Sequence, residues 1–272
     1  MRLGVCSWSL QPTGPDDLVE KVHACGMDAV QLALDPIRSL AWDERRTREA
    51  LDRAGVAILS GMMARRDEDY TTLETIKLTG GVRPDATWPD NLAAAHANAE
   101  LAGRLGLGLV TFHAGFIPHG RNDRERGVML TRLREVIDAF ALRGVRTAFE
   151  TGQEPADKLV ELLGELPAGV GVNFDPANMI LYGSGDEIGA LRRLAPRVAQ
   201  MHVKDARRSA RAGEWGEEVP AGTGDVRWRD FFDIYRREAI CCNLVVEREA
   251  GNDRVRDASA GAALVREAIR LT

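Results

Sequence analysis

The sequence is poor in the features that mark secreted, thiolate-metal or membrane proteins. Its 272 residues include only four cysteines, at Cys6, Cys25, Cys241 and Cys242, and no two of them form a Cys-x-x-Cys pair. We interpret them as reduced thiols, which are typical of a cytoplasmic protein. No apolar run approaches the roughly 20 residues of a membrane-spanning helix, so we expect no membrane partner.

Positive charge is also scarce. The 36 lysines and arginines are outnumbered by 41 aspartates and glutamates, which leaves a formal net charge of −5. Because nucleic-acid-binding surfaces are basic, this balance argues against DNA or RNA as a partner. The opening segment MRLGVCSWSL lacks a basic region followed by a long apolar stretch. It predicts a first β-strand and not a signal peptide.

The composition is that of a folded protein, with 44% hydrophobic and 28% charged residues. Short apolar runs alternate with amphipathic helical segments. We predict strands at residues 2–8, 28–33, 56–61, 108–113, 145–150, 170–175, 197–202 and 243–247. We predict helices at residues 16–25, 43–54, 89–105, 123–143, 155–165, 186–195, 228–238 and 257–270.

Regular alternation of strands and helices predicts parallel strand pairing. Eight such units in a chain of this length are typical of a closed barrel. We therefore expect an α/β fold, a (β/α)8 TIM barrel with a parallel eight-stranded core, formed by residues 1–272 as a single domain. The alternative is an open doubly wound sheet. That fold usually has a glycine-rich phosphate turn after the first strand, and CSWSLQPTG is not such a turn.

Two connections, at residues 62–88 and 203–227, are longer than a simple barrel requires. Both follow predicted strands, and barrel active sites lie at the carboxyl ends of the strands. We therefore expect both to cover the site and to supply substrate contacts, among them Lys204 or Trp215.

The predicted strands in the second half of the chain end in side chains that can bind a metal. Glu150, Asp175, His202 and Glu247 end four strands in succession, and these ends converge on one rim of a barrel. Taken singly, each carboxylate could instead cap a helix or sit in a loop. Together, three carboxylates and an imidazole suit Mn²⁺, Mg²⁺ or Co²⁺ better than a thiolate-type zinc site.

Other polar and aromatic residues lie near the same predicted rim. Trp8 ends the first strand, where it could form the wall of a sugar-sized pocket or belong to the core. His113 ends the fourth strand, and Lys204 follows His202 by two positions, on the same face if the strand continues. Glu249 bears the same relation to Glu247 and competes with it as a candidate ligand.

Six short motifs share this arrangement: HAG at 113–115, FET at 149–151, NFDPAN at 173–178, MHVKD at 201–205, GTGDVRW at 222–228 and VVERE at 245–249. In this ordered set the chain resembles the xylose isomerase-like barrel superfamily of sugar isomerases and epimerases. The resemblance implies one divalent ion, usually Mn²⁺, Mg²⁺ or Co²⁺, bound by Glu150, Asp175, His202 and Glu247, with Zn²⁺ as an alternative. It further implies that Glu150 and Glu247 transfer protons and that the chain forms a homo-oligomer.

The chain also departs from the ketose 3-epimerases of that superfamily. Asn178 stands where they have a substrate-binding histidine, and Ala156 where they have a glutamate. Arg208 does coincide with their substrate-binding arginine. An abasic-site endonuclease of the superfamily uses three zinc ions, and the five histidines here are too few for such a site.

These observations predict an enzyme, a divalent-metal-dependent isomerase or epimerase of a sugar or sugar phosphate. It would work through an enediolate, with Glu150 and Glu247 as acid and base and with Trp8, His113, Asn178, Lys204 and Arg208 as substrate-binding residues. One alternative is a metal-dependent lyase acting on keto-sugars or keto-glycosides. The other is a sugar-binding subunit without catalytic activity.

Overall fold

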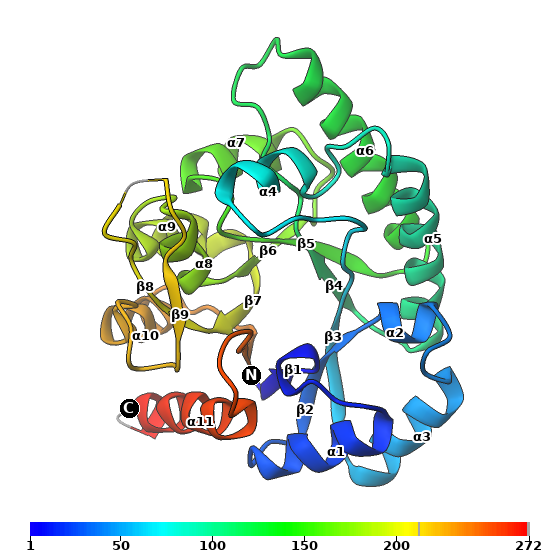
Figure 1. Cartoon of the computed structure of the whole chain (residues 1–272), viewed down its shortest axis with the longest axis vertical. Helices are drawn as coiled ribbons and strands as arrows, with labels where there is room; N and C mark the ends of the chain where they lie inside the picture. Colours follow the sequence, from blue (N-terminus) through cyan, green and yellow to red (C-terminus); the bar gives the residue numbers. More distant parts are fainter. Residues whose placement is uncertain (212, 271–272) are drawn as a thin grey trace.

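The computed structural model describes residues 1–211 and 213–270, and its centre is a closed barrel of eight parallel strands (Figure 1). The order of strands around the barrel is β1-β10-β7-β6-β5-β4-β3-β2. The strands are β1 (Leu3–Cys6), β2 (Ala29–Ala33), β3 (Ala57–Met62), β4 (Leu109–Phe112), β5 (Arg146–Glu150), β6 (Gly171–Phe174), β7 (Val198–Val203) and β10 (Asn243–Val246). The predicted (β/α)8 TIM barrel is therefore confirmed, and the open sheet is excluded.

Helices surround the barrel (Figure 1). They are α1 (Pro15–Ala24), α3 (Glu44–Ala54), α5 (Trp88–Arg104), α6 (Arg124–Ala141), α7 (Ala156–Gly164), α9 (Glu187–Leu194), α10 (Trp228–Arg237) and α11 (Arg254–Arg270). Their buried faces and the apolar strand residues form one large core cluster, in which Phe112 and Phe149 meet edge to face with ring centroids 5.3 Å apart. No helix in the described part of the chain is both long and apolar enough to cross a membrane.

The structure contains short elements that the periodicity did not predict. These are the helices α2 (Asp35–Arg38), α4 (Leu73–Thr79) and α8 (Pro176–Tyr182), the 3₁₀ turns η1 (Trp8–Leu10) and η2 (Ala195–Arg197), and the strands β8 (Asp205–Arg207) and β9 (Glu217–Val219). They span at most seven residues each, too few to establish a helical or strand period.

Both long connections are therefore more ordered than a plain loop. Residues 62–88 include α4, whose first turn is held by a reciprocal capping box between Thr72 and Thr75. Residues 203–227 include the antiparallel pair β8 and β9, with Asp205 opposite Val219. Residue 212 of this connection, and residues 271–272 of the predicted domain, lie outside the described residues.

Polar side chains occupy the centre of the barrel below its carboxyl end. Ser60 on β3 donates to Gln200 on β7 at 2.6 Å, and Gln31 on β2 donates to Thr111 on β4 at 2.8 Å. Neither pair of strands is adjacent in the barrel, so these bonds cross its interior. Gln200 also donates to Asn173 on β6. We call this buried set, Gln31, Ser60, Thr111, Asn173 and Gln200, the amide floor.

Candidate active site

Four side chains from the carboxyl ends of β5, β6, β7 and β10 meet above the amide floor. They are Glu150, Asp175, His202 and Glu247, each of which offers one ligand atom within 4.8 Å of the others. The Nδ1 atom of His202 lies 3.6 Å from Glu150 Oε1, 3.4 Å from Asp175 Oδ2 and 3.2 Å from Glu247 Oε2. All four residues are at most 5% exposed. The strand-end pattern thus predicted residues that the fold brings together.

Neighbouring side chains orient each glutamate. Glu150 accepts hydrogen bonds from the amides of Asn178, at 2.9 Å, and Asn173, at 3.1 Å. Glu247 accepts one from the Trp8 indole and one from the Lys204 ammonium, both at 2.9 Å. These bonds hold the two carboxylates in fixed directions, because each oxygen has its own donor.

Electrostatics keep both glutamates ionised. Burial alone favours the neutral acids, but the charges of His202 and His113 leave the pKa of Glu150 below its ordinary value. Lys204 and His202 do the same for the pKa of Glu247. Burial lowers the pKa of His202, but the facing carboxylates, Glu247 above all, outweigh it and raise that pKa well above its ordinary value.

The four donors fit one divalent cation. Ligand atoms that bind a shared ion at 2.0–2.4 Å are separated by about 3 to 4.8 Å, and the distances around His202 fall in this range. Charge points the same way, because a histidine nitrogen that binds a cation carries no proton, and Lys204 is then the one lysine or arginine among the described residues that pairs with any of the three buried carboxylates. Oxygen donors with one imidazole suit Mn²⁺, Mg²⁺ or Co²⁺.

A cavity of about 540 Å³ opens beside this cluster. Glu247, Lys204, Asn178, His113 and Trp8 line it, together with residues from both long connections. Residues 62–88 contribute Met62, Ala64, Glu68 and Tyr70, and residues 203–227 contribute Trp215 and Glu218 in addition to Lys204. Both connections therefore lie at the carboxyl end of the barrel, as we predicted.

Most of the predicted substrate-binding residues lie in this cavity. Asn178 bridges the two sides of the site, because its amide donates to Glu150 and its carbonyl accepts from Lys204 at 3.3 Å. The Nε2 atom of His113 lies 3.6 Å from Glu150. Glu249 pairs with Lys204 at 2.6 Å, and Glu247 is the one of these two glutamates that joins the cluster.

Arg208 is placed elsewhere. Its guanidinium contacts Glu187 at 3.2 Å, and it is not among the residues that line the cavity. Arg83, another cation of the long connections, pairs with Glu125 at 2.6 Å and is also outside the cavity. The predicted role of Arg208 in substrate binding would require β8 and its connection to move.

The glycines of the segment PAGTGD stabilise the connection that follows β8. The backbone N–H groups of Gly222 and Gly224 both donate to Asp205, at 2.8 and 3.0 Å. A Cβ atom on Gly224 would lie 2.2 Å from the Asp205 carboxylate. These residues therefore wrap the connection around a buried carboxylate and fix it to β8.

Sequence patterns missed several residues of the site. Tyr70, Leu181 and Tyr182 line the cavity but belong to a loop and to α8, which has no strand periodicity. Asn173 contacts the cluster from below, through Glu150. A signal existed for Asn173, because strand side chains alternate and Asn173 is two positions before Asp175.

Known proteins share this architecture. The family model described as xylose isomerase-like TIM barrel matches residues 19–271. A xylose isomerase domain protein from Planctomyces limnophilus is 28% identical with a TM-score of 0.85, over 93% of this chain and 91% of that chain. No curated protein matches the sequence.

Two more distant structures share the fold alone. An L-ribulose 3-epimerase is 14% identical with a TM-score of 0.76, over 99% of this chain and 95% of that chain. The probable 3-DHS dehydratase AsbF, involved in petrobactin synthesis in Bacillus anthracis, is 17% identical with a TM-score of 0.73, over 98% of this chain and 99% of that chain.

Proposed function

Since the chain belongs to the family of xylose isomerase-like TIM barrels, we propose that it is a divalent-cation-dependent isomerase or epimerase of an unphosphorylated sugar. One observation carries the proposal: two buried, ionised glutamates, Glu150 and Glu247, meet beside a sugar-sized cavity within a cluster suited to a cation. Epimerases among the solved structures with this fold support the same class of reaction.

Glu150, Asp175, His202 and Glu247 would hold the cation. When bound, a divalent cation supplies positive charge that stabilises the oxygens of a substrate as its carbon loses a proton. Glu247 of the cluster lines the cavity, so a sugar that enters would meet the cluster on this side with its hydroxyl and carbonyl oxygens. Lys204, with its ammonium 2.9 Å from Glu247, adds a fixed charge on the same side.

The proton chemistry falls to the two glutamates. Glu150 and Glu247 come from β5 and β10, which are separated by β6 and β7 in the barrel. One carboxylate would take the proton from the carbon next to the carbonyl and leave an enediolate. The other would return a proton to the opposite face, which gives epimerisation. If one glutamate carries the proton to the adjacent carbon instead, the result is aldose–ketose isomerisation.

The lining of the cavity argues for an uncharged substrate. Asp35, Glu68, Glu218, Glu247 and Glu249 contribute carboxylates, whereas Lys204 is the one lysine or arginine among the described lining residues. Lys204 is already paired, at 2.9 Å with Glu247 and at 2.6 Å with Glu249. A phosphate would therefore enter without a free cationic partner. Aromatic side chains, Trp8, Tyr70, Tyr182 and Trp215, supply surfaces for the C–H faces of a sugar.

The test is a panel of ketoses and aldoses incubated in heavy water with the Mn²⁺-loaded protein, with products resolved by mass and by sugar identity. We expect a product that carries one carbon-bound deuterium and is otherwise unchanged in composition. Glu150→Gln and Glu247→Gln should each abolish deuterium uptake, with bound Mn²⁺ measured beside activity, since both are also candidate ligands.

Glu154→Gln is the matched control, because Glu154 is a buried glutamate that pairs with His119 and does not line the cavity. It should leave turnover intact. A product that has lost water, or a cleaved sugar, would show that the activity is that of a lyase and not of an isomerase. The dehydratase that shares the fold catalyses a reaction of this class. Sugar that binds and returns without deuterium would identify a binding protein.

A further inference from the structure

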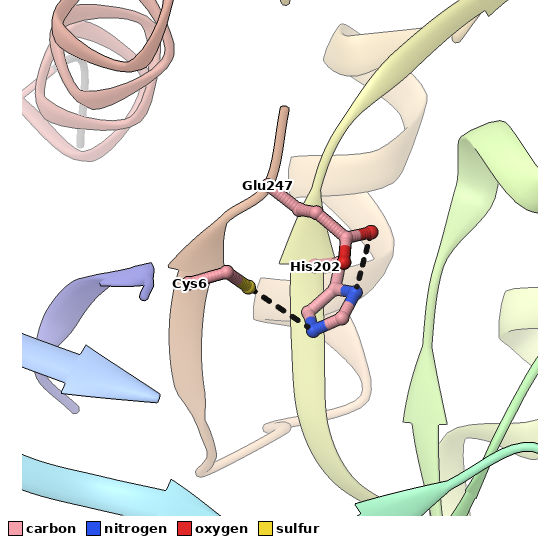
Figure 2. Close-up of side chains that lie close together, drawn as sticks. All are labelled: Cys6, His202 and Glu247. Carbon is pink, nitrogen blue, oxygen red and sulfur yellow. Dashed lines mark hydrogen bonds and ion pairs between the residues drawn. The ribbon is translucent and has the colours of Figure 1, made fainter. Parts of the chain in front are cut away.

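The two ring nitrogens of His202 face different partners. Nδ1 faces the three carboxylates of the cluster. Nε2 points to the opposite side of the ring from Glu247, toward Cys6 of β1 (Figure 2). On that side Nε2 lies 2.8 Å from Gln31 Oε1, 3.0 Å from Asn173 Nδ2 and 3.7 Å from Cys6 Sγ. The Cys6 thiol therefore borders on the same histidine, and it also lies within 4.8 Å of a carboxylate oxygen of Glu247.

The Nε2 environment presents a choice between two protonation forms. An oxygen such as Gln31 Oε1 needs a proton on Nε2, whereas an amide NH₂ such as that of Asn173 needs a lone pair there. The Asn173 NH₂ has another acceptor, Glu150 at 3.1 Å, and its carbonyl is held by Gln200. The Asn173 NH₂ therefore keeps an oxygen acceptor in either form, whereas Gln31 Oε1 without a proton on Nε2 would keep only the weak thiol donor Cys6, at 3.5 Å.

The direction of the Gln31 amide is set by its other end. Its NH₂ donates to Thr111 Oγ1 at 2.8 Å, and that hydroxyl in turn points at the Met62 sulfur. This leaves Oε1 turned toward His202, where the Cys6 thiol also donates to it at 3.5 Å. Gln31 is fully buried, so no water competes for these positions.

We infer that Gln31 is a positioning residue that accepts a hydrogen bond from His202 Nε2–H and so leaves the Nδ1 lone pair aimed at the cation site. The inference rests on the cation of the proposed function and adds a residue from β2 to a site otherwise built by β5, β6, β7 and β10. A histidine that binds a metal through one nitrogen needs its other N–H held by an acceptor, which fixes both the tautomer and the ring orientation.

The test compares cation affinity across variants by calorimetric titration of the purified metal-free protein with Mn²⁺. Gln31→Leu keeps the approximate size of the side chain but removes the acceptor, and we expect about 10- to 100-fold weaker binding. Gln31→Glu restores an acceptor and should recover most of that loss. Gln200→Leu is the control, because Gln200 is a buried amide of the same floor that contacts Ser60 and Asn173 and not His202.

If Gln31 has a structural role only, both leucine variants should lower the stability of the metal-free protein, as measured by urea denaturation. Their Mn²⁺ affinities should then be the same. A ¹⁵N NMR spectrum of the wild-type protein with Mg²⁺ should show His202 protonated at Nε2. Three results would overturn the inference: protonation at Nδ1, Gln31→Leu binding like the wild type, or Gln31→Glu binding no better than Gln31→Leu.

If Gln31→Leu does not fold, the NMR spectrum and the affinity of Gln31→Glu decide, since the carboxylate acceptor in that variant should keep the Mn²⁺ affinity close to that of the wild type. Wild-type protein that binds Mn²⁺ but converts no sugar would contradict the proposed function only. Wild-type protein that binds neither Mn²⁺ nor Mg²⁺ would overturn both.

Discussion

Asp175 divides its two carboxylate oxygens between the fold and the site. Its Oδ1 accepts the backbone N–H of Asn178 at 2.8 Å and caps α8, while its Oδ2 lies 3.4 Å from His202 Nδ1. The two interpretations of a carboxylate after a strand, helix cap or ligand, are therefore compatible here. The cap also aims the second oxygen, because a capping side chain has little rotational freedom.

This division predicts different results for two substitutions. Asp175→Asn keeps a good capping side chain but loses the charge, so metal-free stability should change little while Mn²⁺ affinity falls at least about tenfold. Asp175→Ala should lose affinity and also about 1 kcal/mol of stability. Asp123→Ala, at the equivalent cap of α6, should cost similar stability and leave Mn²⁺ binding unchanged. Titration and urea denaturation of all three variants provide the measurement.

The cysteines make a second prediction for single residues. Cys241 is exposed, whereas burial raises the pKa of Cys25 to about 11, that of Cys242 to about 12 and that of Cys6 still further. Because the thiolate is the reactive form, iodoacetamide at pH 8 should label Cys241 within the folded protein and spare the other three. Peptide mass mapping measures this, and rapid native labelling of Cys242 would contradict it.

The raised pKa values of the buried thiols also predict how the free energy of unfolding depends on pH. A thiol whose pKa is raised by folding contributes fully below its ordinary value of 9.0, and the contribution is lost as pH rises toward about 11 for Cys25 and 12 for Cys242. The free energy of unfolding of Cys242→Ala should therefore fall less between pH 8 and 10 than that of Cys241→Ala, which keeps the buried thiol.

At the scale of elements, the connection from β7 to α10 is organised around Asp205. The carboxylate accepts N–H groups from Gly222, Gly224 and Val226 and the indole N–H of Trp228 at 2.9 Å. The same connection carries Trp215, whose ring packs edge to face on Tyr182 at 4.6 Å between centroids. The hydrogen bonds around the buried Asp205 carboxylate thus position one wall of the cavity.

Gly224→Ala tests this arrangement, since its Cβ would fall 2.2 Å from Asp205 Oδ1 and 2.6 Å from the Ala206 carbonyl oxygen. We expect a loss of about 1–3 kcal/mol from overpacking and a raised KM for the sugar, with Mn²⁺ affinity unchanged. Gly164→Ala is the control in α7, where nothing lies within 4 Å of the added carbon. It should be neutral or slightly stabilising, because alanine favours helix.

At the scale of the whole molecule, the cation would join four separate strand–helix units. Its ligands follow or end β5, β6, β7 and β10, so its binding free energy adds to the stability of the closed barrel. We expect EDTA to lower Tm and added Mn²⁺ to restore it. At a Mn²⁺ concentration 100 times Kd, binding adds about 2.7 kcal/mol to the free energy of unfolding. The Tm of Asp175→Asn should rise less, because with tenfold weaker affinity the same Mn²⁺ concentration adds only about 1.4 kcal/mol. An equal response in that variant would place the bound cation elsewhere.

The acidic cavity predicts a preference between substrates of the same skeleton. A ketose should be turned over with kcat/KM at least about tenfold above its terminal phosphate ester, because the phosphate finds no free cation. Glu249→Gln removes one partner of Lys204 and should narrow that difference. Steady-state kinetics of both substrates with both proteins measure this difference in kcat/KM. Faster turnover of the phosphate ester by the wild type would contradict the proposal of an unphosphorylated substrate.

Local patterns in the sequence were sufficient for the barrel and for the cluster. Apolar runs alternating with amphipathic segments specify strands and helices over short stretches, and parallel strands joined by helices place every carboxyl end on one rim. Glu150, Asp175, His202 and Glu247 could therefore be grouped from their positions alone. Short elements such as α8 were not predictable, because they are stabilised by tertiary contacts such as the capping bond of Asp175.

Tertiary structure decided which equivalent candidates point into the site. The sequence offers Glu247 and Glu249 as equals, and only the placement of Trp8 and Lys204 directs Glu247 to the cluster while Glu249 pairs at the edge. It offers Arg208 near the rim, and Glu187 holds it outside. Gln31 lies 171 positions from His202 in the sequence, so no local pattern could associate them. Such contacts depend on side-chain direction and on barrel closure, which exist only once all eight strands have paired.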